Sequence, residues 1–83
     1  MQVRVRYFAS LREALGSGEV VDAPQDCTVG ALRDLLVARG GVHAQALARS
    51  RAVRAAVDQT MADDAAGLRD GVEVAFFPPV TGG

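Results

Sequence analysis

The chain has 83 residues, of which 49% are hydrophobic and 23% are charged, and its formal net charge is −1. This combination indicates one small globular domain, 1–83, whose core is too thin for a large enzyme with a deep pocket of its own. All nine basic residues are Arg and are interleaved with ten acids, which argues against nucleic acid as the main partner and excludes lysine-dependent catalysis within the chain.

The N-terminal segment predicts a strand and then a short helix. In residues 2–8, apolar side chains alternate with Arg4 and Arg6, which is the period of a half-buried strand. Ser10 and Glu13 have the spacing of a capping box, in which each side chain binds the other residue's backbone amide. We therefore expect a short helix that starts at Ser10.

The next segment predicts a return strand. Gly16 is placed to end the short helix, and Gly16-Ser17-Gly18 has the composition of a turn. Residues 19–23 then predict a second strand, which can pair with the first as in a hairpin. Pro24 ends it.

The main helix is predicted at residues 29–39, with Thr28 as its N-cap. Its expected inward stripe has helical spacing, with Arg33 and Asp34 facing away; the stripe consists of Val29, Leu32, Leu35 and Leu36. Gly40-Gly41 is expected to stop the helix.

The second half of the chain predicts two more strands. Residues 42–50 are rich in Ala and have the composition of a helical turn, and 53–57 alternate as a strand that ends at Asp58-Gln59. Residues 62–67 are expected to be a loop, and 72–77 are the last strand. The order of elements predicts an α+β domain in which one main helix packs across a mixed sheet, which is the β-grasp (ubiquitin-like) fold.

The C-terminal residues 78–83 carry the most distinctive pattern. Pro78-Pro79 ends strand pairing, because proline lacks an amide donor and holds the chain extended. Val80 and Thr81 then lead to Gly82-Gly83, the narrowest end that a peptide can have. An arm of this kind can carry the Gly83 carboxylate into the active site of another protein, although an inert frayed terminus also fits a Gly-Gly end. A carboxylate needs activation first, for instance as an acyl-adenylate.

The tail also carries a family resemblance. Phe76-Phe77-Pro78-Pro79-Val80-Thr81-Gly82-Gly83, preceded by 70–75, closely resembles the end of the small, sulfur-carrying subunits of molybdopterin synthase, the MoaD/ThiS-like family. Further matches cover nearly the whole chain: Tyr7-Phe8-Ala9, Leu11-Arg12-Glu13, Thr28-Val29, Ala31-Leu32-Arg33 and 55–60. The family usually has Asn where this chain has Asp58, and 40–50 has no clear match.

The resemblance implies a chemical role for Gly83. An ATP-dependent activating enzyme would adenylate this carboxylate, and a sulfurtransferase system would convert it to a thiocarboxylate. Two copies of the chain would bind a dimer of the large subunit as a heterotetramer. Each tail, with Gly82 and Gly83 at its end, would give its sulfur to cyclic pyranopterin monophosphate and build the molybdopterin dithiolene. The catalytic groups would belong to the large subunit, and the chain itself would bind no cofactor and no metal.

The resemblance also implies a partner-binding surface. It assigns Phe8, Arg12, Met61 and Phe77 to this surface, together with the arm residues Pro78, Pro79, Val80 and Thr81. Alternatives stay open: the aromatic residues can be core, Met61 can fill a gap, and Arg12 can be a solvated helix residue.

Two residues with reactive side chains have plainer interpretations. Cys27 is the only Cys and is expected to be buried and inert, because no second Cys or obvious base accompanies it. His43 is the only His, lacks a metal-ligand partner in the sequence, and is expected at the surface.

Three other functions remain open. The chain can be a sulfur carrier for thiazole formation in thiamine synthesis or for tRNA thiolation. It can be a ubiquitin-like modifier conjugated through Gly83, or an interaction module with an inert tail. We expect a cytoplasmic protein, because neither a signal peptide nor an apolar run of about 18 residues is visible.

Overall fold

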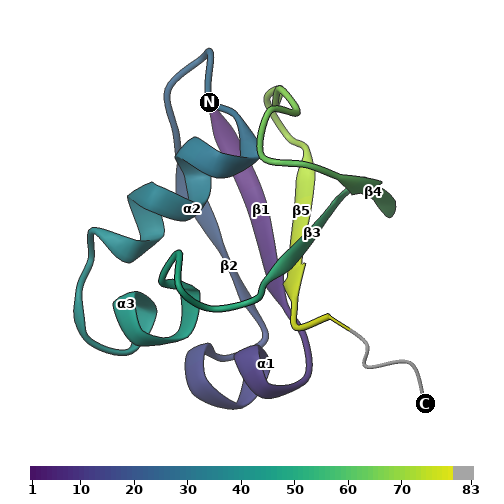
Figure 1. Cartoon of the computed structure of the whole chain (residues 1–83). Coiled ribbons are helices and arrows are strands. Elements are labelled where there is room, and N and C mark those ends of the chain that lie inside the picture. The colour runs from purple at the N-terminus through teal and green to yellow at the C-terminus, as the bar shows by residue number, and fades with distance from the viewer. Residues whose placement is uncertain (80–83) are drawn as a thin grey trace.

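The computed structural model of the chain describes residues 1–79 (Figure 1). The described elements are, in chain order, β1 (Gln2–Tyr7), α1 (Ser10–Leu15), β2 (Gly18–Asp22), α2 (Val29–Val37), α3 (Gly41–Leu47), β3 (Arg54–Val57), β4 (Thr60–Ala62) and β5 (Glu73–Phe77).

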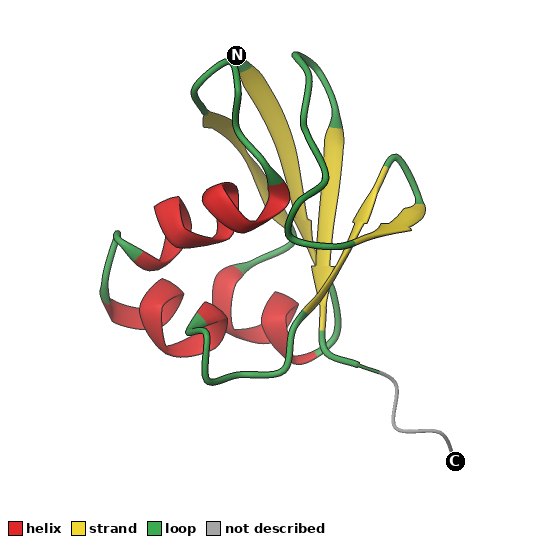
Figure 2. Cartoon of the chain, turned by 45° about the horizontal axis from the view of Figure 1, so that its top comes forward, coloured by secondary structure: helices red, strands yellow, loops and turns green. Residues whose placement is uncertain are grey.

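The strands form one mixed sheet in the order β2-β1-β5-β3-β4. β1 pairs antiparallel with β2 and parallel with β5, and β3 pairs antiparallel with both β5 and β4. The helices lie on one side of this sheet, with α2 across it (Figure 2). This arrangement confirms the predicted β-grasp fold.

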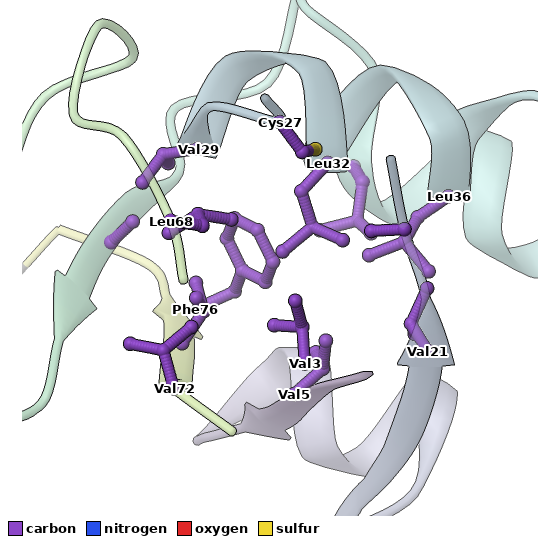
Figure 3. Packing of buried hydrophobic residues seen from close by; sticks show 14 of the residues in the cluster. Val3, Val5, Val21, Cys27, Val29, Leu32, Leu36, Leu68, Val72 and Phe76 are labelled. Atoms are coloured by element: carbon purple, nitrogen blue, oxygen red, sulfur yellow. The ribbon is translucent and has the colours of Figure 1, made fainter. Parts of the chain in front are cut away.

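The core lies between the sheet and α2 (Figure 3). Leu32 and Leu36 of α2 are fully buried against the inward residues of the central strands, such as Val3 and Phe76. The alternation predicted for residues 2–8 is confirmed, since Val3, Val5 and Tyr7 are buried while Arg4 and Arg6 are exposed. Burial of these side chains supplies most of the favourable free energy of folding.

The main helix begins as predicted and ends earlier. The Thr28 hydroxyl accepts a hydrogen bond from the Ala31 amide at 3.2 Å, which confirms the N-cap. The regular helix ends at Val37, because the amides of Arg39 and Gly40 bond to carbonyls only three residues back. Gly40, with φ of 75°, then starts α3 rather than a loop. Residues 41–47 therefore form a complete short helix where a helical turn was expected.

The predicted capping box at Ser10 is wrong. Ala9 is the N-cap of α1, and no side chain caps this helix. The first amide bonds run from Leu11 and Arg12 to the Phe8 carbonyl, and from Glu13 to the Ala9 carbonyl. The chain turns sharply after β1 through a positive φ of 53° at Ala9, which places Ser10 already inside the helix. Gly16, with φ of 90°, ends α1 as predicted.

The prediction that Arg33 faces away from the core is wrong. Arg33 is 6% exposed, and its guanidinium donates to the carbonyls of Leu47, Ala48 and Arg51 at 2.7, 2.6 and 2.9 Å. Burial and, less strongly, the nearby Arg49 lower the pKa of this guanidinium. Arg33 thus attaches the end of α3 and the following loop to α2.

Strand β4 was not predicted. It has three residues, Thr60–Ala62, at the edge of the sheet, and follows β3 through a two-residue turn at Asp58 and Gln59. Both turn residues have positive φ, 47° and 69°, as in the type I′ hairpin turn. Asp58 also accepts bonds from the Glu73 amide and from Arg69, at 3.1 and 2.7 Å. The expected loop 62–67 accordingly starts one residue later.

None of the three helices described in residues 1–79 is long and apolar enough to cross a membrane.

Candidate functional site

The sheet has one face without helices, which we call the outer face. Side chains alternate across each strand, so residues paired in register point to the same face. Phe8 follows β1, and its amide donates to the Phe76 carbonyl at 3.1 Å. This places Phe8 beside Phe77 on the outer face, opposite to the buried pair Tyr7 and Phe76.

Met61 lies on the same face two strands away. The register aligns Met61 with Ala56 of β3, and Ala56 with Ala75 of β5. Met61 is 58% exposed and Phe8 is 39% exposed, whereas Phe77 is half-buried. Phe8, Phe77, Ala75, Ala56 and Met61 thus form an apolar patch, which we call the outer patch, and exposed large apolar side chains of this kind are typical of interaction sites.

Arg12 and Pro78 lie beside this face rather than on it. Arg12 is an exposed residue of α1, the helix that follows Phe8. Pro78 directly follows β5 and lines a groove of about 380 Å³ between α1 and α3. The groove is mostly apolar and is lined by Ser10, Leu11, Ala14, Val42, Gln45, Ala46, Arg51, Ala52, Val53 and Pro78.

Strand pairing stops at Phe77, as the diproline predicted. Pro78 and Pro79 are half-buried. Four of the predicted site residues, Val80, Thr81, Gly82 and Gly83, lie outside the described residues. The described part of the chain therefore places the start of the predicted arm next to the outer patch.

Cys27 is buried, as predicted. Its thiol is 3.4 Å from the Thr28 carbonyl, and the residue is 4% exposed. Burial, followed by the nearby charge of Asp26, raises the pKa of this thiol. A buried thiol that resists ionisation is a poor nucleophile, so Cys27 is not a sulfur-carrying site.

His43 belongs to a polar cluster around Glu19. The Glu19 carboxylate accepts bonds from the Tyr7 hydroxyl at 2.9 Å and from Arg39 at 2.5 Å, and the His43 Nε2 lies 3.3 Å from it. Burial opposes the ionisation of Glu19, but bonds from Arg39, Tyr7 and His43 outweigh it and lower the pKa of the carboxyl. The cluster joins β1, β2 and α3, which is a structural role. Residues 1–79 contain no group of His, Cys, Asp or Glu that could hold a metal ion.

A larger hollow of about 760 Å³ lies between the start of α2 and the β3–β4 hairpin. Its charged lining residues are Arg33, Arg54, Asp63 and Asp64. Three of them bind groups within the chain: Arg33 binds backbone carbonyls, Asp64 pairs with Arg49 at 2.5 Å, and Asp63 accepts from the Ala65 amide at 3.0 Å. The fourth, Arg54, pairs in register with Phe77 of the outer face. We therefore assign the functional site to the outer patch and the arm that starts beside it.

Sequence reasoning missed two residues of this face, Arg6 and Arg54. The Arg6 guanidinium lies 5.3 Å from the centre of the Phe8 ring, and Arg54 pairs in register with Phe77. The signal for Arg6 was visible in the alternation of residues 2–8. The signal for Arg54 was its place just before the apolar pair Ala55-Ala56, although its partner strand could not be known.

Comparison with known proteins identifies a matching family and several similar proteins. The sequence profile described as the ThiS family matches residues 5–83. The molybdopterin synthase sulfur carrier subunits of Escherichia coli and Haemophilus influenzae are 43% and 35% identical, each alignment spanning 98% of this chain and 99% of the relative. The crystal structure of Haloferax volcanii small archaeal modifier protein 1 superposes with a TM-score of 0.77 and 29% identity, covering 95% of this chain and 98% of that one.

Proposed function

This chain belongs to the ThiS family, and from that premise we propose that it is the sulfur carrier subunit of a molybdopterin synthase. The observation that carries the proposal is the similarity, over nearly the full length, to two sulfur carrier subunits of that enzyme, which are 43% and 35% identical to this chain. The position of the outer patch beside the start of the arm supports it, because a carrier must bind its partner while delivering its C-terminus.

The chemistry takes place at the Gly83 carboxylate. A separate enzyme transfers AMP from ATP to this carboxylate and releases pyrophosphate. A sulfur donor then displaces AMP, which leaves a thiocarboxylate whose sulfur is nucleophilic at neutral pH. This sulfur attacks a side-chain carbon of cyclic pyranopterin monophosphate and displaces an oxygen substituent from it. Hydrolysis of the acyl–sulfur bond then leaves sulfur on the pterin and returns the carboxylate. The dithiolene needs two such transfers, each from one thiocarboxylate. Gly82 and Gly83 suit a narrow channel because they lack side chains.

The partner is the large subunit, with two copies of each chain in a heterotetramer. Phe8, Met61 and Phe77 supply apolar contact area, while Arg12 borders it. The arm residues 78–83 enter the large subunit, which supplies the catalytic acids, bases and phosphate-binding groups. The chain binds no cofactor of its own, and we place it in the cytoplasm, where ATP-dependent activation occurs.

Reconstitution tests the proposal. The activated carrier, the large subunit and cyclic pyranopterin monophosphate are combined, and molybdopterin is measured. Deletion of Gly83 should abolish product, while Phe77→Ala should weaken binding of the large subunit and leave thermal stability largely intact. Unchanged product after deletion of Gly83 would contradict the proposal.

A second candidate function is protein modification, which the likeness to an archaeal modifier protein favours. The same acyl-adenylate would then be captured by a lysine amine of a target protein. This chain has no Lys, so it could not be extended into lysine-linked chains of itself. Adducts on a denaturing gel that disappear when Gly83 is deleted would support this function, whereas a thiocarboxylate consumed by the pterin supports the first.

A further inference from the structure

The outer face has an uneven charge distribution. Its outward strand residues include the cations Arg4, Arg6 and Arg54 and the anions Asp22 and Glu73. Asp22 lies at the far end, 3.7 Å from the N-terminal amine. The half of the face that carries the outer patch is therefore cationic, although the chain as a whole has a net charge of −1.

Arg6 has weak partners within the chain. Its side chain is 52% exposed and lies 3.9 Å from the Glu73 carboxylate, at the limit of an ion pair. Its guanidinium also lies against the ring of Phe8. This cation–π contact positions the charge on the outer face while the guanidinium stays hydrated. Apart from this weak contact with Glu73, the N–H groups of the Arg6 guanidinium remain available to an incoming carboxylate.

Arg54 has no ion pair and no side-chain hydrogen bond within residues 1–79. It is exposed at the start of β3 and pairs in register with Phe77, the last residue before the arm. The two arginines therefore stand on opposite sides of β5, with Arg6 aligned with Ala75 and Arg54 with Phe77.

We propose that Arg6 and Arg54 are specificity-determining residues, which pair with carboxylates that the large subunit presents on either side of the apolar contact. A partner that covers the outer patch removes water from both guanidinium groups. This loss of hydration is unfavourable unless opposite charges replace the water. Within residues 1–79, Glu73 is the one acid that pairs with either guanidinium, so the partner has to supply the remaining acids. The inference rests on the proposed function.

The test measures the association rate with the large subunit from the same organism at low and high salt. The variants are Arg6→Gln, Arg54→Gln and the double variant. Loss of electrostatic steering should slow association of the double variant about tenfold at low salt and flatten the salt dependence. The Arg6→Lys and Arg54→Lys variants keep the charge and should retain most of the rate.

The matched control is Gln25→Glu. Gln25 is exposed in the loop between β2 and α2. This loop lies at the end of the molecule that carries the N-terminus (Figure 1). The Gln25→Glu substitution changes the net charge by the same amount as one Arg→Gln substitution. Because it lies away from the outer patch, it should leave the association rate nearly unchanged. Association rates of both single Gln variants that equal the rate of this control would overturn the inference, as would Lys variants as slow as the Gln variants.

Two further outcomes are distinguishable. Failure of the unmodified chain to bind the large subunit would contradict the proposed function itself. Normal binding of the double variant to the large subunit, with slowed binding to the activating enzyme, would overturn the assignment of the large subunit as the acidic partner.

Discussion

Replacement of Arg33 with Met should strongly destabilise the fold without changing the surface that binds partners. The substitution keeps an unbranched apolar stem and removes the guanidinium with its three hydrogen bonds to the carbonyls of Leu47, Ala48 and Arg51. The bond to Leu47 is buried, so that carbonyl loses its partner where water cannot replace it. The other two carbonyls are partly buried and can be rehydrated.

The expected cost is about 3 kcal/mol. One unsatisfied buried carbonyl costs about 1–3 kcal/mol, and the lost charge-assisted bonds add to it, while release of a buried guanidinium offsets part of the loss. A chain of this size has a total stability of about 4–12 kcal/mol. The variant should therefore fold, with Tm lower by about 10–20 °C. Urea unfolding followed by circular dichroism measures the change directly.

Arg49→Met is the matched control. Arg49 also binds α2, through Asp34 and the Gly30 carbonyl, but its side chain is 45% exposed. Loss of an exposed ion pair costs about 1 kcal/mol or less. If Arg33→Met destabilised the chain no more than Arg49→Met, the structural role assigned to Arg33 would be refuted.

Three further predictions concern stability. Ala9→Gly should stabilise the chain by about 1 kcal/mol in urea unfolding, because φ of 53° and ψ of −130° at this position strain any side chain; a loss of stability would contradict this. Burial and the bond to Glu19 raise the pKa of Tyr7, and burial raises that of Cys27, so the folded state holds both protons longer than the unfolded state. The contribution of these two groups to the free energy of unfolding should be complete below their unfolded pKa values. It should fall as pH rises above about 8.5 for the thiol and 10 for the phenol. In urea unfolding at increasing pH, the free energy of unfolding of the Tyr7→Phe variant should therefore decline less steeply than that of the unchanged chain. The Glu73 amide, followed by Arg69, lowers the pKa of Asp58; its contribution is present above about pH 4 and lost as pH falls through the folded value, so Asp58→Asn should flatten the acid limb of the Tm profile, and an unchanged limb would contradict this.

Much of the fold was predictable from local patterns. The alternation in residues 2–8 and the Thr28 cap each depend on residues only a few positions apart. The folded structure therefore contains both as predicted. Helix α3 and the buried position of Arg33 depend on each other. Arg33 follows Val29 by four residues and precedes Leu36 by three, which is the spacing of the buried stripe. Only the carbonyls at the end of α3 make an arginine acceptable there.

The candidate site was predictable in composition but not in layout. The diproline and the Gly-Gly end indicated the arm, and the resemblance indicated Phe8, Met61 and Phe77. Their common face follows from the register of β1, β5, β3 and β4, which sequence spacing cannot give. The charges of Arg6 and Arg54 become meaningful only once this register places them beside the patch.

The most direct test of the central claim is the intact mass of the thiocarboxylate form of the chain before and after incubation with the large subunit and cyclic pyranopterin monophosphate. The starting form differs from the plain chain by one oxygen replaced with sulfur at Gly83. The proposed function predicts that the mass returns to that of the carboxylate only when both the large subunit and the pterin are present. A thiocarboxylate that persists with both present would contradict molybdopterin synthesis as the function of this carrier.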